Sequence, residues 1–232
     1  MALACAALLA GPAFASTQLL TNGGFETGDF TGWTASTFAG SSGTIVATDA
    51  AVSPVSAQSV AGATEGTYHV LTGQSGPGAY AVSQDFLAPV DATSLLLSFD
   101  FFSASTAGLF DGGLDPFCCG STQNARVDVL SFGSDVFSNA GVVHSIVAPV
   151  ITGNFGTPYQ SYALDLLPFL SAGSNYTLRF AQADNGGIMT MGVDNVSLVA
   201  ETSAVPVPAS GLLLVGAVGG IAALRRRKRQ AA

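Results

Sequence analysis

The chain has 232 residues, of which seven are Lys or Arg and fifteen are Asp or Glu, and its formal net charge is −8. Five of the basic residues lie between positions 225 and 229, so the remainder carries two (Arg126 and Arg179) against fifteen acidic ones, a net charge of −13. A surface this acidic disfavours nucleic acid and anionic lipid as partners, and it tolerates Ca²⁺.

Residues 1–15 predict a signal peptide. The segment reads MALACAALLAGPAFA and is a short apolar run that ends in an Ala-x-Ala cleavage pattern before Ser16. A positively charged start is missing from it. Cys5 would leave with the peptide, and we expect the rest of the chain to be exported.

Residues 16–200 predict one all-β domain. Long segments with a helical period are absent, while short alternating segments recur between turn-forming residues. The predicted strands span residues 44–48, 66–72, 80–86, 94–102, 126–132, 142–150, 161–167, 176–183 and 188–199. We interpret residues 22–33 as turns, 107–124 as a long excursion and Asp184–Gly187 as a hairpin turn. This rhythm favours an antiparallel β-sandwich.

Residues 201–232 predict a membrane-targeting tail in three parts. Residues 201–208 form a linker, 209–224 an uncharged stretch that fits one transmembrane helix, and 225–232 a basic cytoplasmic end. The cations are Arg225, Arg226, Arg227, Lys228 and Arg229. Because such clusters stay on the cytoplasmic side, they place the residues before 205 outside.

The tail resembles the PEP-CTERM sorting signal of Gram-negative bacteria that make exopolysaccharide, which is also labelled an ice-binding protein C-terminal domain. The family has a Val-Pro-Glu-Pro-Ala core, an apolar helix and an Arg-rich end. The corresponding core here is Val205, Pro206, Val207, Pro208 and Ala209, with Val207 in place of the usual glutamate. The resemblance implies cleavage by an exosortase, so that an inner-membrane precursor yields a product at the cell surface or in the extracellular matrix. The alternative is a plain C-terminal anchor.

Two further motifs lie at the ends of the domain. They are Asn-Gly-Gly-Phe-Glu at residues 22–26, followed by Gly32-Trp33, and Gly-Val-Asp-Asn-Val-Ser-Leu at 192–198. Together they resemble the first and last strands of jelly-roll, galactose-binding-like carbohydrate-binding modules. The resemblance implies a structural Ca²⁺ held by Glu26 and Asp194. A turn-capping glutamate and an edge aspartate are the alternative.

Three further residues have two interpretations each. Trp33 could stack on a sugar, although a lone Trp in a glycine-rich turn is more often a core residue. Cys118 and Cys119 are adjacent, so they could form a vicinal disulfide or a bridge to another chain.

The catalytic case is weak. The sequence lacks a Gly-x-Ser-x-Gly elbow, a His-Glu-x-x-His motif and a phosphate-binding loop, and its acids form no recognisable pair. We therefore expect a non-enzymatic, exported surface or matrix protein that binds polysaccharide or fills space in exopolysaccharide. The alternative is a secreted glycoside hydrolase or another enzyme that modifies the matrix.

Overall fold

The computed structural model describes residues 15–118 and 120–203. Ser16–Thr202 form one compact unit, close to the predicted domain boundaries of 16 and 200. The sorting motif at 205–209, the predicted membrane helix at 209–224 and the basic cluster at 225–229 lie outside the described residues, so they stay predictions. Within residues 15–118 and 120–203, no helix combines the length and apolarity needed to span a bilayer.

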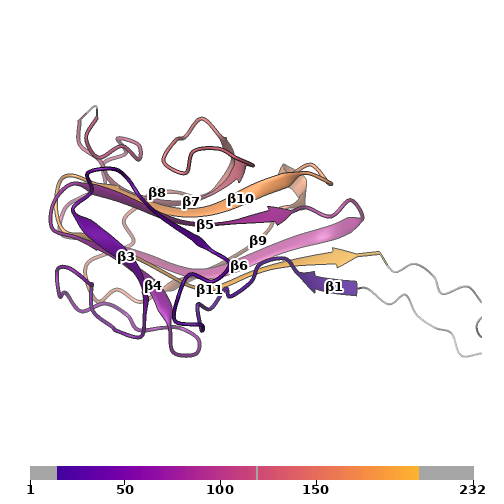
Figure 1. The fold of residues 1–232 in the computed structure, drawn as a ribbon, viewed down its shortest axis with the longest axis horizontal. Coiled ribbons are helices and arrows are strands. Elements are labelled where there is room, and N and C mark those ends of the chain that lie inside the picture. The colour runs from indigo at the N-terminus through magenta and orange to yellow at the C-terminus, as the bar shows by residue number, and fades with distance from the viewer. Residues whose placement is uncertain (1–14, 119, 204–232) are drawn as a thin grey trace, which may run out of the picture. The chain divides into compact units, whose positions relative to one another are not determined.

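The described residues form eleven strands and one short 3₁₀ helix (Figure 1). The strands are β1 (Ala15–Gln18), β2 (Thr34–Thr37), β3 (Gly43–Thr48), β4 (His69–Gln74), β5 (Gly78–Leu87), β6 (Ala92–Ser105), β7 (Gln123–Ser131), β8 (Val142–Val150), β9 (Gln160–Asp165), β10 (Asn175–Asp184) and β11 (Met189–Thr202), and η1 is Leu167–Phe169. The nine strands expected from the sequence are all present, with β8 at its predicted bounds. The alternation of apolar and polar residues therefore located them correctly.

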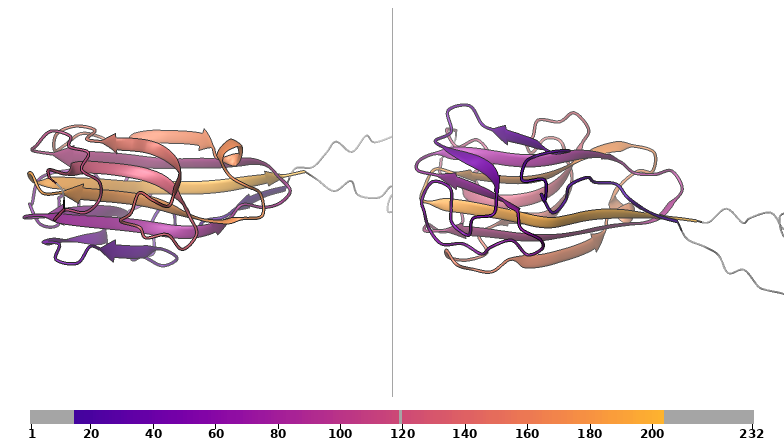
Figure 2. Two further views of the ribbon diagram at one scale, coloured as in Figure 1. Left: turned by 90° about the horizontal axis from the view of Figure 1, so that it is seen from above. Right: turned by 60° about the horizontal axis from the view of Figure 1, so that its bottom comes forward.

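The strands form two packed antiparallel sheets (Figure 2). Sheet A has the order β3-β4-β11-β6-β9, and β1 also pairs with β11. Sheet B has the order β2-β5-β10-β7-β8. The prediction of an all-β antiparallel sandwich is confirmed, and the first and last strands, β1 and β11, are paired.

The core lies between the sheets. On β10, Tyr176, Leu178 and Phe180 point into it, as their spacing predicts, and they meet Phe99 and Phe101 from β6. Each of these side chains is almost completely buried. Burial of a side chain of this size stabilises a fold by about 1.5–3 kcal/mol.

The outer face of sheet B is covered as well. Small residues on β5 and β10, among them Ala81 and Ala181, pack against Leu114 and Phe137 from the segments that follow β6 and β7. This second layer leaves one part of the sheet open, and the candidate site lies there.

Two features differ from the sequence-based expectation. β1 and β2 were not predicted, because each has only four residues and nearly all of them are exposed. The Asp184–Gly187 turn is not a hairpin, since β10 pairs within sheet B and β11 within sheet A. Instead, Asn185 exchanges hydrogen bonds with Thr122, which fixes the turn against the 113–122 segment.

Candidate functional site

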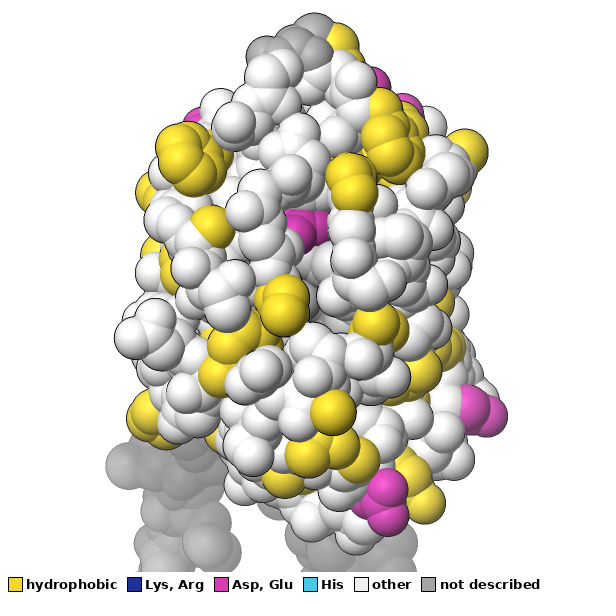
Figure 3. Space-filling view, turned by 90° about the vertical axis from the view of Figure 1, so that its left-hand side faces the viewer, with side chains coloured by type: hydrophobic (Ala, Val, Ile, Leu, Met, Phe, Trp, Pro, Cys, Tyr) yellow, Lys and Arg dark blue, Asp and Glu magenta, His cyan; other side chains and the backbone are white. Residues whose placement is uncertain are grey.

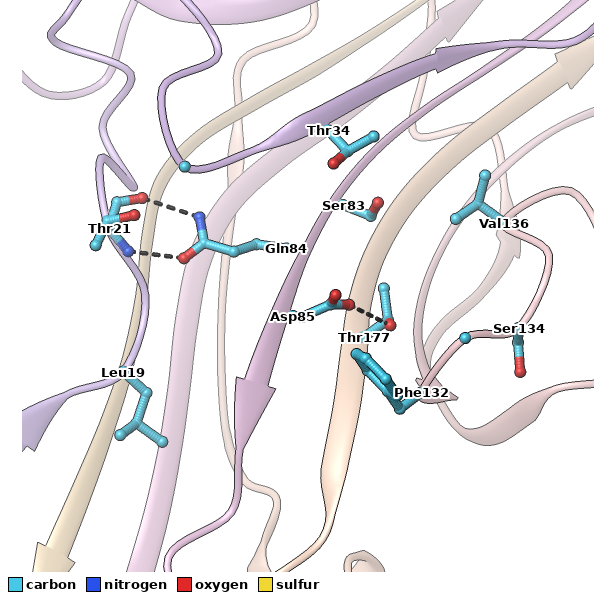
Figure 4. A pocket seen from close by; sticks show the side chains of 12 residues that line it. Leu19, Thr21, Thr34, Ser83, Gln84, Asp85, Phe132, Ser134, Val136 and Thr177 are labelled. Atoms are coloured by element: carbon cyan, nitrogen blue, oxygen red, sulfur yellow. Dashed lines mark hydrogen bonds between the residues drawn. The ribbon is translucent and has the colours of Figure 1, made fainter.

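An open groove of about 580 Å³ lies on the outer face of sheet B (Figure 4). Its floor comes from β2, β5 and β10, one wall from the 132–136 segment and the other from residues 19–21. The lining residues are Leu19, Thr21, Gly32, Thr34, Ser83, Gln84, Asp85, Phe132, Gly133, Ser134, Val136 and Thr177.

Hydroxyl groups and one carboxylate dominate the floor. The sheet register sets Thr34 beside Ser83 and Thr177 beside Asp85, so all four side chains share the outward face. Thr177 donates from Oγ1 to Oδ1 of Asp85 at 2.5 Å. Within the described residues, Oδ2 of Asp85 has no hydrogen-bond partner, and Asp85 is exposed. Thr34 and Asp85 are exposed, so a polar ligand can bond to their side chains, whereas Ser83 and Thr177 are nearly buried.

The first wall carries an exposed aromatic ring. Phe132 follows β7 directly and has 61% of its surface exposed. Gly133 next to it has a φ of +78°, a conformation that glycine adopts without strain. An exposed ring beside a hydroxyl-rich floor is a feature that a stable fold does not require.

The side chain of Arg179 holds the 132–136 wall in place. Its Nη1 donates to the carbonyl oxygens of Val136 and Ser138, both at 2.9 Å, while Nε donates to Oδ2 of Asp128 at 3.2 Å. Nη2 forms an ion pair with the same oxygen. Burial lowers the pKa of the Arg179 guanidinium, and the Asp128 carboxylate partly offsets that effect. The side chain thereby ties the 136–138 backbone to β7 and β10.

The second wall depends on Gln84 and Trp33. Gln84 exchanges two hydrogen bonds with the backbone of Thr21, at 2.8 and 3.0 Å. Trp33 donates from Nε1 to the carbonyl oxygens of Thr21 and Asn22, at 3.0 and 3.1 Å. Its ring is 6% exposed and packs on Phe25. Of the two interpretations of Trp33, this burial matches the core residue.

Glu26 and Asp194 both hold the segment 64–68. Glu26 accepts backbone hydrogen bonds from Thr67 and Tyr68, the shortest at 2.9 Å. Asp194 accepts from the amide and the hydroxyl of Thr64, at 2.6 and 3.0 Å. The contacts of Glu26 match the turn-capping alternative. Asp194 is not at a sheet edge, because β11 lies between β4 and β6 and the side chain is fully buried.

The calcium interpretation stays a prediction. A carboxylate offers about four lone-pair positions, so N–H donors do not use all of them. Asp100, which the sequence did not suggest, lies opposite Asp194 in the register of β6 and β11 and accepts from the same Thr64 hydroxyl at 2.7 Å. Among the described residues, no group of three or more His, Cys, Asp or Glu side chains is arranged to hold a metal ion.

Cys118 is disulfide-bonded. Cys119 lies outside the described residues, so the pairing of the two stays a prediction.

The residues of the groove were not identifiable from the sequence. Asp85, Phe132 and Thr177 belong to three strands or their ends and carry no motif. The sole signal was that Thr177 and Asp85 occupy the polar positions of alternating segments, which marks an outward face without marking a site.

No family model and no curated protein matches this sequence. Among solved structures, the module TmCBM61 in complex with β-1,4-galactotriose is 15% identical, with a TM-score of 0.48 over 78% of this chain and 97% of that one. The enzymatically active domain of tailspike protein 4 from bacteriophage CBA120 is 13% identical (TM-score 0.49, 78% of this chain and 21% of that one). The Stig cyclase Fisc from Fischerella sp. TAU is 15% identical (TM-score 0.49, 82% and 100%). Likenesses at this level assign neither a family nor a ligand.

Proposed function

We propose that the sandwich is a non-enzymatic glycan-binding domain and that the groove on sheet B is its binding site. The observation that carries the proposal is the exposed ring of Phe132 in the same groove as the exposed side chains of Thr34 and Asp85. A sugar has an apolar ring face and a rim of hydroxyl groups. An aromatic ring can cover the face while hydroxyls and a carboxylate bind the rim.

The groove's charges favour binding over hydrolysis. Glycoside hydrolysis by the common mechanisms uses two carboxyl groups about 5–9.5 Å apart, one as an acid and one as a nucleophile or base. Asp85 is the one carboxylate among the described residues that line the groove. This supports binding of a glycan without hydrolysis. A secreted glycoside hydrolase is the second candidate function.

The sequences of the two terminal segments support a proposal for where the protein acts. We propose export through the predicted signal peptide, recognition of Val205–Ala209 by an exosortase, and transfer from the inner membrane to the cell surface or matrix. The uncharged stretch and the Arg-rich end support this route. Exopolysaccharide is then the polymer that the groove would meet.

Affinity electrophoresis of the full-length protein in gels containing neutral polysaccharides tests the binding proposal. We expect saturable retardation by at least one of xylan, galactan and mixed-linkage β-glucan, weakened about tenfold in Phe132→Ala, which corresponds to about 1.4 kcal/mol. Phe169→Ala is the control, since Phe169 is also about half exposed but does not line the groove. Equal retardation of both variants, or release of reducing ends from the bound polymer, would contradict the proposal.

A further inference from the structure

The described residues that line the groove carry negative charge and no positive charge. Asp85 is exposed in the floor, and no Lys or Arg is found among the described lining residues. The described residues contain only two cations, Arg126 and Arg179. The face of the molecule in Figure 3 likewise presents acidic side chains and no Lys or Arg among its described residues.

Both cations belong to one buried ion-pair network. Arg126 donates from Nε to Oδ2 of Asp128 at 2.9 Å, and Arg179 pairs with the same carboxylate. Arg179 and Asp128 are 0% exposed and Arg126 is 7% exposed. All three therefore act as a structural unit within the covered part of sheet B.

Arg179 lies close to the floor but is turned away from it. It is directly opposite Ser83 in the register of β5 and β10, and two residues from Thr177. Its N–H groups are bonded to Asp128 and to the carbonyl oxygens of Val136 and Ser138. Turning the guanidinium into the groove would break these bonds and weaken the charge compensation of a fully buried carboxylate, which is strongly unfavourable.

Among the described residues that line the groove, a carboxylated or sulfated glycan would therefore meet a carboxylate and no available cation. Anionic glycans are bound in proteins by Arg or Lys, through charge-assisted and often bidentate hydrogen bonds. Here the free Oδ2 of Asp85 can accept a sugar hydroxyl but repels an anion, and the net charge of −13 outside the tail adds to the repulsion.

We propose that the groove selects neutral glycans and excludes anionic ones, with Asp85 as the residue that sets this charge selectivity. This inference rests on the proposed function. It further predicts that the domain recognises the neutral component of a matrix even where acidic polymers are present.

Two derivatives of the same polysaccharide, one anionic and one neutral, test whether the charge of the ligand decides binding. The neutral polysaccharide that retards the full-length protein most strongly is carboxymethylated, and a second portion is hydroxyethylated to the same degree of substitution. We expect the carboxymethyl form to bind at least tenfold more weakly than the hydroxyethyl form at low salt. We also expect the gap to shrink to about threefold or less near 1 M NaCl, where the Debye length is about 3 Å.

Two variants then test whether Asp85 causes the difference in binding between the two derivatives. Asp85→Asn should narrow the gap between the two derivatives, while Asp91→Asn, an equal change of charge at an exposed residue outside the groove, should leave it unchanged. Equal binding of both derivatives would overturn the selectivity and leave glycan binding standing. An equal response of the two variants would overturn the role of Asp85. Absence of any retardation that depends on Phe132 would instead remove the proposed function itself.

Discussion

Arg179 and Asp128 form an ion pair in which neither side chain is exposed to solvent. They lie opposite each other in the register of β7 and β10. Arg179 also bonds two carbonyl oxygens in the loop that continues from the groove wall, so the pair links the sheet to the wall. Arg126 binds the same carboxylate, and its side-chain hydrogen bonds among the described residues go to Asp128 alone.

We expect Arg179→Met to lower the free energy of unfolding by about 3–5 kcal/mol, because it weakens the compensation of a buried charge and leaves two loop carbonyls without a donor. Urea unfolding measures this loss. The variant should also lose glycan affinity in conditions where it is fully folded, because the wall is no longer fixed. Arg126→Met removes a positive charge beside the same carboxylate but no hydrogen bond to the loop, so it should cost less than Arg179→Met and leave the glycan affinity unchanged. If both variants lost affinity equally, Arg179 would have no positioning role.

Asp184 is a buried carboxylate at the end of β10, 1% exposed, and neither of its oxygens has a hydrogen-bond partner among the described residues. Burial raises its pKa to about 7, and the nearby Gln74 amide lowers it in part. Burial, and then the Asp184 carboxylate, raise the pKa of Tyr80 to about 12.

The amide of Gln74 has a fixed orientation. The backbone N–H of Met191 donates to Thr72, the Thr72 hydroxyl donates to Gln182, and the Gln182 amide donates to Oε1 of Gln74. Because Oε1 of Gln74 accepts the last of these hydrogen bonds, the NH₂ group of Gln74 faces Asp184.

The stability of the domain should therefore depend on pH. An unfolded Asp has a pKa of about 3.9, so between roughly pH 4 and 7 the folded state binds the extra proton. The free energy of unfolding contributed by Asp184 is fully present below about pH 4 and is lost as the pH rises through about 7, by at most about 4 kcal/mol. Asp184→Asn should remove this dependence and be more stable than the wild type at pH 8. Asp91→Asn, at an exposed site, should follow the wild-type curve, and a wild-type curve that is flat from pH 4 to 8 would contradict the assignment.

The fold could be predicted from the sequence further than the site could. Strands can be predicted in segments such as Val142–Val150 and Tyr176–Ala183, because side chains alternate between the buried and the exposed face with a period of two residues. Pairing between distant strands leaves no comparable trace, so the separation of β10 and β11 into different sheets was missed. The groove depends on that pairing, since Asp85 and Thr177 are 92 residues apart in sequence and in contact in the fold. Trp33 was ambiguous because its turn chemistry says nothing about depth.

Trp33 offers a test of the second wall. Trp33→Phe keeps an aromatic ring in the core but removes the Nε1 donor, leaving the carbonyl oxygens of Thr21 and Asn22 without it. We expect a loss of about 2–3 kcal/mol in the free energy of unfolding, from the lost donor and the smaller ring together. Tryptophan fluorescence disappears with this change, so circular dichroism in urea is the measurement. A variant as stable as the wild type would show that these hydrogen bonds and the extra ring volume contribute nothing.

An experiment can also decide whether the domain binds Ca²⁺. The proposed ion would be held by Glu26 and Asp194, which both contact the 64–68 segment. If it binds, Ca²⁺ at a hundredfold excess over its dissociation constant should stabilise the wild type by about 2.7 kcal/mol, and chelation should reverse this.

Glu26→Gln separates this role from loop capping. Its amide nitrogen would face the backbone N–H groups of Thr67 and Tyr68, so we expect a loss of about 1–2 kcal/mol even in chelator, because two hydrogen bonds weaken. A calcium site requires in addition that the Ca²⁺-dependent stabilisation disappear in Glu26→Gln and in Asp194→Asn but persist in Asp91→Asn. Thermal unfolding of the four proteins in Ca²⁺ and in chelator gives the answer. A wild type whose midpoint does not respond to Ca²⁺ would assign both carboxylates to the 64–68 segment alone, since the capping contacts need no metal.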